Sequence, residues 1–201
     1  MLVHGLWMRG IAMALLAARL RRHGFRTLSP SYPSVRQGLD DNADRLACVL
    51  ASRHRGRPSH LVGHSLGGVL ILHMLARHPG LPVGRIVLLG SPVRGSSLAR
   101  CLDRKVALRW IVGRSMADWQ RQPRPQPPTA HPIALIAGNF ALGSACFCRE
   151  VPKPHDGVVA VCETRLDGQP PPQVLAVSHS GMLISRRVAA RVAAFLRSGP
   201  G

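Results

Sequence analysis

The sequence predicts an α/β fold in three layers: a reduced, mostly parallel sheet of about six strands with helices on both faces. Two observations carry this expectation. Apolar runs of strand length alternate with segments of helical period along the whole chain. The chain has 201 residues, of which 46% are hydrophobic, so it can bury the core of a single domain spanning residues 1–201.

The first elements follow this alternation in order. Apolar Leu2–Val3 opens the chain, and a helical stretch over residues 9–23 stops at Gly24, a residue type that favours helix ends. Phe25–Leu28 predicts a short strand that leads into a turn rich in serine and proline. A second helix begins near Asp40, whose carboxylate complements the positive helix end. Its apolar face would hold Leu39, Ala43, Leu46, Ala47 and Leu50.

The remaining elements continue the alternation, with two interruptions. We expect strands at His60–Val62, Arg85–Leu89, Ile133–Ala137 and Val174–Val177, and helices over residues 66–78 and 182–196. Residues 91–132 contain one plausible helix and a proline-rich end, and residues 138–158 show no clear period. Because long irregular loops of compact α/β proteins tend to line sites, we expect residues 91–132 to form a short cover over the site.

The pattern Gly63-His64-Ser65-Leu66-Gly67, extended by Gly68, joins an expected strand to an expected helix. A tight turn at this place lifts a serine hydroxyl to the edge of the sheet. Glycine is needed at positions 63 and 67, because a Cβ at either would meet the neighbouring backbone. We therefore predict that Ser65 is a nucleophile; the alternative is a glycine-rich turn with an incidental serine.

A serine nucleophile needs a base, and the base needs an acid that orients it. His179 ends an apolar run and precedes a helix, as the chain order serine, acid, histidine requires. Four carboxylates lie where the acid should fall: Glu150, Asp156, Glu163 and Asp167. Asp156 is preferred, because a turn glycine and a short apolar run follow it. Glu150 is the main rival, and a plain Asp-Gly turn is the alternative.

The developing oxyanion needs two backbone N–H groups aimed at one point. Leu66 follows the nucleophile and offers one of them, and Leu6, in the early His4-Gly5 turn, offers the other. Aromatic side chains could line an acyl pocket, although aromatics are more often plain core. The candidates are Trp7, Trp110, Trp119, Phe140 and Phe147.

Five segments together resemble bacterial lipases and esterases of the α/β-hydrolase superfamily: residues 2–7, 63–68, 90–92, 156–159 and 178–183. The likeness covers about residues 1–197 and is strongest to small serine esterases related to the GPI-inositol-deacylase-like branch. It implies a Ser65–His179–Asp156 triad that cleaves carboxylic esters through an acyl-enzyme, without a cofactor or metal. Superfamily members usually carry two further strands before the His-Gly turn. The chain is therefore expected to be a minimal member, or to have a biological start other than Met1.

Two other classes of function remain open beside the esterase. A thioesterase or acyltransferase would use the same triad, and a non-catalytic basic protein on this scaffold would bind nucleic acid or anionic lipid. The net charge is +18, but 25 of the 27 basic residues are arginines scattered over every segment, and aromatic residues are only 4%. We therefore expect a small-molecule ester or lipid-like substrate and no nucleic-acid partner. Peripheral contact with anionic lipid would involve Arg186, Arg187, Arg191 and Arg197.

Localisation is expected to be cytoplasmic. No apolar stretch approaches the roughly 18 residues that span a bilayer, and no charged segment precedes an apolar signal core. The five cysteines are odd in number and lack metal-site spacing, so we expect reduced thiols. They are Cys48, Cys101, Cys146, Cys148 and Cys162.

Overall fold

The computed structural model describes residues 1–53, 56–122, 131–143, 145, 148 and 150–198. Within these residues one parallel sheet runs in the order β1-β2-β3-β4-β5. Its strands are β1 (Leu2–Val3), β2 (Ser59–His64), β3 (Val83–Leu89), β4 (Ile133–Gly138) and β5 (Gln173–Leu175). The continuous apolar character of the inner strands fits a sheet that is covered on both faces.

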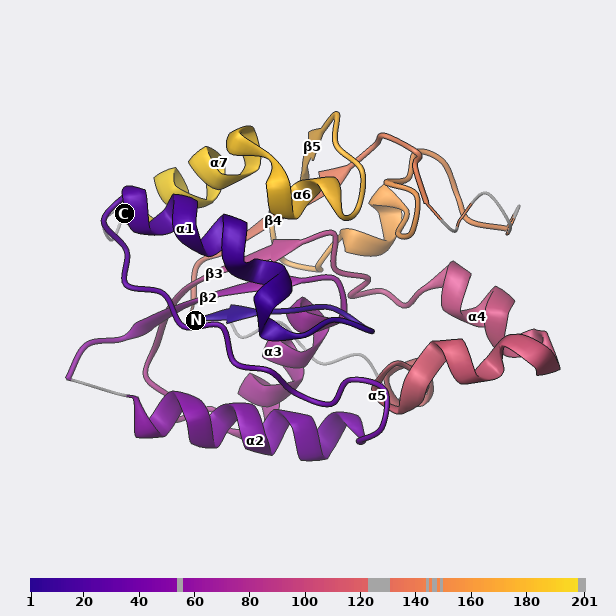
Figure 1. Ribbon diagram of the computed structural model, residues 1–201, viewed down its shortest axis with the longest axis horizontal. Coiled ribbons are helices and arrows are strands. Elements are labelled where there is room, and N and C mark those ends of the chain that lie inside the picture. The colour runs from indigo at the N-terminus through magenta and orange to yellow at the C-terminus, as the bar shows by residue number, and fades with distance from the viewer. Residues whose placement is uncertain (54–55, 123–130, 144, 146–147, 149, 199–201) are drawn as a thin grey trace.

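Helices cover both faces of the sheet, as predicted (Figure 1). One face carries α1 (Ala14–Arg22), preceded by the 3-10 turn Gly10–Met13, together with α6 (Gly181–Ile184) and α7 (Arg186–Arg197). The other face carries α2 (Leu39–Ser52) and α3 (Leu66–Arg77). Two apolar clusters fill the spaces between the layers, one under each set of helices. The three-layer α/β prediction is therefore confirmed.

The sheet has five strands among the described residues, not the six expected. Phe25–Leu28 is the predicted strand that does not form. The Phe25 N–H donates to the carbonyl of Leu20 and so completes the end of α1 (3.1 Å). At its other end, the Leu28 carbonyl accepts the N–H of Leu2 (2.7 Å). β1 is only two residues long, so it offers too few outward-facing groups on this edge to form a ladder with residues 25–28.

Two helical predictions also need correction. The single C-terminal helix is divided into α6 and α7 by Ser185, whose backbone is extended and whose hydroxyl caps α7 at Val188 N (3.3 Å). Residues 91–132 contain two α-helices, α4 (Ser97–Arg104) and α5 (Arg109–Arg121), with the 3-10 turn Val106–Leu108 between them. We call residues 97–121 the cap. Pro123, Pro125, Pro127 and Pro128 lie outside the described residues.

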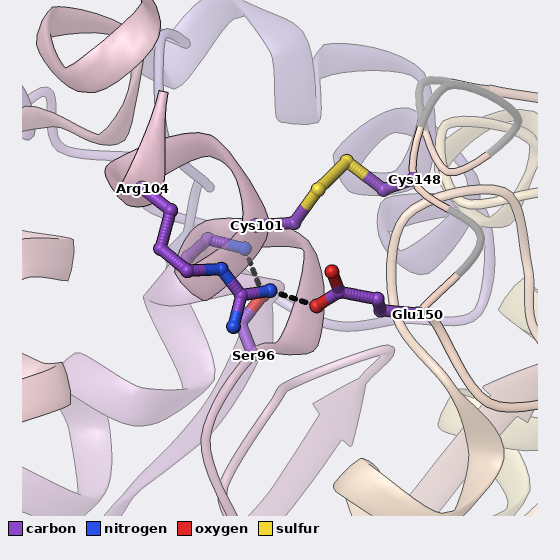
Figure 2. Close-up of a disulfide and its surroundings, with 6 residues drawn as sticks. Ser96, Cys101, Arg104, Cys148 and Glu150 are labelled. Atoms are coloured by element: carbon purple, nitrogen blue, oxygen red, sulfur yellow. Dashed lines mark hydrogen bonds and ion pairs between the residues drawn. A yellow bond between two sulfur atoms is a disulfide. The ribbon is translucent and has the colours of Figure 1, made fainter. Parts of the chain in front are cut away.

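The cap is covalently tied to the loop before Asp156. Cys101 of α4 and Cys148 form a disulfide with a Cα–Cα distance of 6.4 Å, and an Arg104–Glu150 ion pair lies beside it (Figure 2). The expectation of reduced thiols is wrong for this pair, because α4 packs against the loop in a small apolar cluster that brings the two sulfurs together. Cys48 and Cys162 are free and exposed, and Cys146 lies outside the described residues. No helix in the described part of the chain is long and apolar enough to cross a membrane.

Candidate active site

Ser65 occupies the sharp turn between β2 and α3. Its backbone is left-handed, with φ 54° and ψ −127°, a conformation that non-glycine residues rarely adopt. A Cβ on Gly63 would lie 2.4 Å from the Gly68 Cα, and one on Gly67 would lie 2.2 Å from the Val3 carbonyl oxygen. The predicted need for glycine at both positions is confirmed, because the strand, the turn and the helix pack closer than any side chain allows.

His179 and Asp156 form a buried pair at the carboxyl edge of the sheet. The His179 Nδ1 lies 2.7 Å from Asp156 Oδ2, and since a carboxylate only accepts, Nδ1–H is the donor. The other carboxylate oxygen accepts the backbone N–H groups of Val158 (2.9 Å) and Val159 (2.7 Å). The backbone N–H of His179 also donates to the Asp156 carbonyl (2.8 Å). These contacts fix the ring and leave Nε2 as the nitrogen able to accept a proton.

The three rival carboxylates lie elsewhere. Glu150 pairs with Arg104 and Asp167 pairs with Arg94, both on the surface. Glu163 is buried, but its two oxygens accept the backbone N–H groups of Ala160 and Ser97, so it anchors the start of α4. Of the four candidate acids, only Asp156 contacts His179.

The loop formed by residues 4–7 (the 4–7 loop) lies directly against Ser65. A Cβ on Gly5 would lie 3.0 Å from the Ser65 Cβ. The Leu6 N–H donates to no acceptor among the described residues. Leu66 is the first residue of α3, and the first N–H groups of a helix have no partner within it. Both N–H groups predicted to hold an oxyanion therefore lie in segments next to Ser65 and donate to no acceptor among the described residues.

His4 and Tyr32 hold the start of this loop. The His4 Nδ1–H donates to the Gly5 carbonyl (2.8 Å), and Nε2 accepts the Tyr32 N–H (3.2 Å). The Tyr32 hydroxyl donates to the His4 carbonyl (2.8 Å), and the two rings stack at 4.3 Å. Burial lowers the pKa of His4, which agrees with a neutral ring that donates at one nitrogen and accepts at the other.

His64 makes a contact with His179 that the sequence did not reveal. Its ring is fully buried, and Nε2–H donates to the carbonyl of His179 (3.0 Å). Burial, and secondarily the neighbouring charge of His179, lowers the pKa of His64 to about 3, so the ring is neutral. Its hydrogen bond therefore helps to fix the backbone of His179. The only signal in the sequence was a histidine directly before the predicted nucleophile.

A cavity of about 260 Å³ is lined by Ser65 and His179 and by residues of the cap. The Ser65 hydroxyl has no hydrogen-bond partner among the described residues, so its oxygen is available to a molecule in the cavity. Most of the lining is apolar. The cap contributes Leu98, Ala99, Leu102, Ile111, Val112 and Met116.

Trp7 is the one predicted pocket aromatic that lines this cavity in the described structure. Phe140, in the loop after β4, is 58% exposed, and Trp110 of α5 is 66% exposed, and neither lines the cavity. Trp119 is fully buried in the core. Phe147 lies outside the described residues.

A larger hollow of about 750 Å³ lies at the opposite, amino-terminal ends of the strands. Its described lining holds no carboxylate, and its histidine, His60, uses Nδ1 to accept the Arg85 N–H (2.9 Å). It therefore offers no pair of base and orienting acid comparable to His179 and Asp156.

Comparison with known proteins identifies relatives of the chain. The family described as "Alpha/beta hydrolase family" matches residues 1–161, a range that includes Ser65 and Asp156 and ends before His179. The putative carbamate hydrolase RutD of Pantoea ananatis is 36% identical over 148 residues, which are 73% of this chain and 50% of that protein. RutD of Yersinia enterocolitica is 47% identical over 105 residues, 52% of this chain and 35% of that protein. The chain thus spans about half or less of the length of these curated relatives.

Among solved structures, the mature Bacillus licheniformis lipase BlEst2 superimposes with a TM-score of 0.75. The match covers 97% of this chain and 89% of the lipase, at 23% identity, and so establishes a shared fold. These matches do not test the likeness to the GPI-inositol-deacylase-like branch, which stays a prediction.

Proposed function

Because the chain belongs to the α/β hydrolase family, we propose that it is a serine hydrolase that cleaves carboxylic esters through an acyl-enzyme on Ser65. One observation carries the proposal. The strained Ser65 and the His179 ring, which is oriented by Asp156 at 2.7 Å, open into the same apolar cavity. A strained serine, a histidine with one nitrogen free and a buried acid are the groups that acyl transfer requires.

The proposed reaction has two steps. As the Ser65 oxygen attacks the ester carbonyl, His179 Nε2 accepts the hydroxyl proton, and the N–H groups of Leu6 and Leu66 stabilise the oxyanion. His179 then protonates the departing alcohol, and water repeats the attack on the acyl-enzyme to release the acid and restore Ser65. Asp156 keeps the ring in the required tautomer and stabilises its cation. The Ser65 hydroxyl and His179 Nε2 form no hydrogen bond in the described structure, and the proposed reaction brings them within hydrogen-bond distance when substrate binds.

The cavity favours a short or medium apolar group on the substrate. Its volume of about 260 Å³ lies just below the range of about 300–1,000 Å³ that is usual for ligand pockets. A neutral acyl chain would lie against Leu102, Val112 and Met116 of the cap. The proposed partner is thus a small-molecule ester, and the proposed chemistry needs no cofactor.

Carbamate hydrolysis is the second candidate, because the two RutD proteins bear the name putative carbamate hydrolase. An unsubstituted carbamate is small and polar, whereas the lining contributed by the cap is apolar. This contrast ranks the ester first. The same groups would also cleave a thioester.

Labelling with a fluorophosphonate probe tests the proposal. We expect the wild type and the control Ser52→Ala, which alters an exposed serine of α2, to be labelled, and Ser65→Ala to be unlabelled but folded. A panel of p-nitrophenyl esters from acetate to octanoate, compared with an aryl carbamate and an acyl-CoA, then ranks the substrates. Ester turnover by Ser65→Ala at the wild-type rate would contradict the proposal.

A further inference from the structure

Two non-glycine residues in the described part of the chain have a left-handed backbone: Ser65 (φ 54°) and Trp7 (φ 61°). Both line the cavity. A bulky side chain disfavours this conformation, which persists only where the surroundings hold it, and such positions concentrate at functional sites. The conformation of Ser65 follows from the turn between β2 and α3, so Trp7 needs an explanation of its own.

The cap holds Trp7. The indole Nε1–H donates to the carbonyl of Ile111 at 2.7 Å, across 104 residues of sequence. The ring also meets Trp110 edge to face, with centroids 5.5 Å apart. Burial does not explain the conformation, since Trp7 is 52% exposed. The hydrogen bond and the ring contact are thus the interactions that counter the backbone strain.

The part of the cap that holds Trp7 is positioned separately from the rest of α5. Gly113 breaks the helix with φ 66° and ψ 161°. The segment after it is anchored to the start of α2: Asn42 Nδ2 donates to Ser115 Oγ (2.9 Å), and the Leu39 N–H donates to Asp118 Oδ2 (3.1 Å). Before the break, Ile111 and Val112 line the cavity, and the Ile111 carbonyl receives the indole N–H.

We infer that Trp7 is a positioning residue whose indole latches the 4–7 loop to the cap and thereby aims the Leu6 N–H at the oxyanion. This inference rests on the proposed function of the site. Trp7 follows Leu6 directly, so holding the Trp7 backbone restricts the peptide after Leu6. Gly5 lies against Ser65 and restricts the peptide before it. The negative charge on the substrate oxygen develops in the transition state, so the latch acts on kcat. A variant that keeps an aromatic ring at this lining position should leave KM unchanged.

Trp7→Phe and Trp110→Phe form a matched pair for the test. The first removes the indole donor of the latch. The second keeps an aromatic ring that can still meet Trp7 edge to face, and removes only a donor that bonds within the cap, to Ala107 (3.1 Å), from a residue that does not line the cavity. With a p-nitrophenyl ester, we expect Trp7→Phe to lower kcat about 3- to 10-fold at an unchanged KM, as loss of one hydrogen bond implies. Trp110→Phe should remain within about 2-fold of the wild type in kcat.

A second measurement separates the latch from a general loss of structure. A trifluoromethyl ketone forms an oxyanion adduct with a reactive serine, whereas the corresponding methyl ketone binds only as a ground-state analogue. Trp7→Phe should weaken the trifluoromethyl ketone by the same factor as kcat and leave the methyl ketone unchanged. Equal kcat values for the two variants, or a raised KM with unchanged kcat, would overturn the inference. If the fluorophosphonate probe fails to label wild-type Ser65, the proposed function fails first and the inference with it.

Discussion

Breaking the Cys101–Cys148 disulfide should lower the stability of the protein substantially. The bond joins residues 47 positions apart and ties α4 of the cap to the loop that precedes Asp156. For a closed loop of this length, the entropy removed from the unfolded chain corresponds to about 4 kcal/mol at 25 °C. This figure is an upper value, because residual structure in the unfolded state reduces it.

Equilibrium unfolding in urea without reductant measures the effect. Cys101→Ser and Cys148→Ser remove the same bond, so each should lower the free energy of unfolding by up to about 4 kcal/mol, and by similar amounts. The controls Cys48→Ser and Cys162→Ser alter free, exposed thiols and should change it by less than about 0.5 kcal/mol. A dithiol reductant should bring the wild type to the level of Cys101→Ser and leave that variant unchanged.

The reasoning would be refuted by unfolding free energies of Cys101→Ser and Cys148→Ser that match those of the control variants. Equal stability of the wild type with and without the dithiol, with complete reduction verified by thiol titration, would refute it as well. Either result would mean that the cross-link does not constrain the cap relative to the loop before Asp156.

Four further predictions concern single side chains. Asp156→Asn should fold but lose about 10³- to 10⁴-fold in kcat, because the amide no longer holds the His179 tautomer, as steady-state ester kinetics will show. Gly67→Ala should destabilise the protein by about 3 kcal/mol in urea unfolding, because its Cβ would lie 2.2 Å from the Val3 carbonyl oxygen. Glu163→Gln should cost about 1–3 kcal/mol in the same assay, since one buried N–H of Ala160 or Ser97 loses its acceptor. The pKa of His64 is lowered to about 3 in the folded state, from about 6.5 in the unfolded state, so its contribution to stability is complete above pH 6.5 and is lost as the pH falls. Between these two pKa values the free energy of unfolding should drop by about 1.4 kcal/mol per pH unit, and His64→Asn should remove this slope.

The predictions for Gly67 and Glu163 have matched control substitutions in the chain. Gly80→Ala adds a Cβ that meets nothing within 4 Å and should be nearly neutral, and Glu150→Gln changes an exposed carboxyl. Burial also lowers the pKa of His4, His60 and the Met1 amine, and these groups remain in His64→Asn, so only the difference between the two pH profiles is diagnostic. Wild-type activity in Asp156→Asn, or identical pH slopes for His64→Asn and wild type, would contradict the corresponding contacts.

The sequence predicted those parts of the fold that depend on local pattern. The turn around Ser65 lies between an apolar strand and an apolar helix, and steric demand alone places glycine at Gly63 and Gly67. The pairing of His179 with Asp156 could be predicted because the expected order of serine, acid and histidine places the acid before His179, and a turn glycine follows Asp156. Each of these inferences needs only a few consecutive residues and the topology.

Features that depend on contacts between distant segments were missed. The partner of Cys101 depends on how the cap folds back onto the loop at Cys148, which no spacing rule gives. Phe25–Leu28 has the composition of a strand, but the neighbouring β1 is only two residues long. The Leu28 carbonyl accepts the Leu2 N–H, and no ladder forms. The hydrogen bond from Trp7 to Ile111 depends in the same way on the break at Gly113.

The central claim is that Ser65 carries the acyl group during turnover. Rapid mixing with p-nitrophenyl butyrate, followed by acid quenching and peptide mapping by mass spectrometry, tests it directly. We predict a burst of one p-nitrophenol per protein molecule and a butyryl group on the peptide that contains Ser65, with neither in Ser65→Ala. A butyryl group on any other residue, or steady turnover in Ser65→Ala at the wild-type rate, would contradict the account.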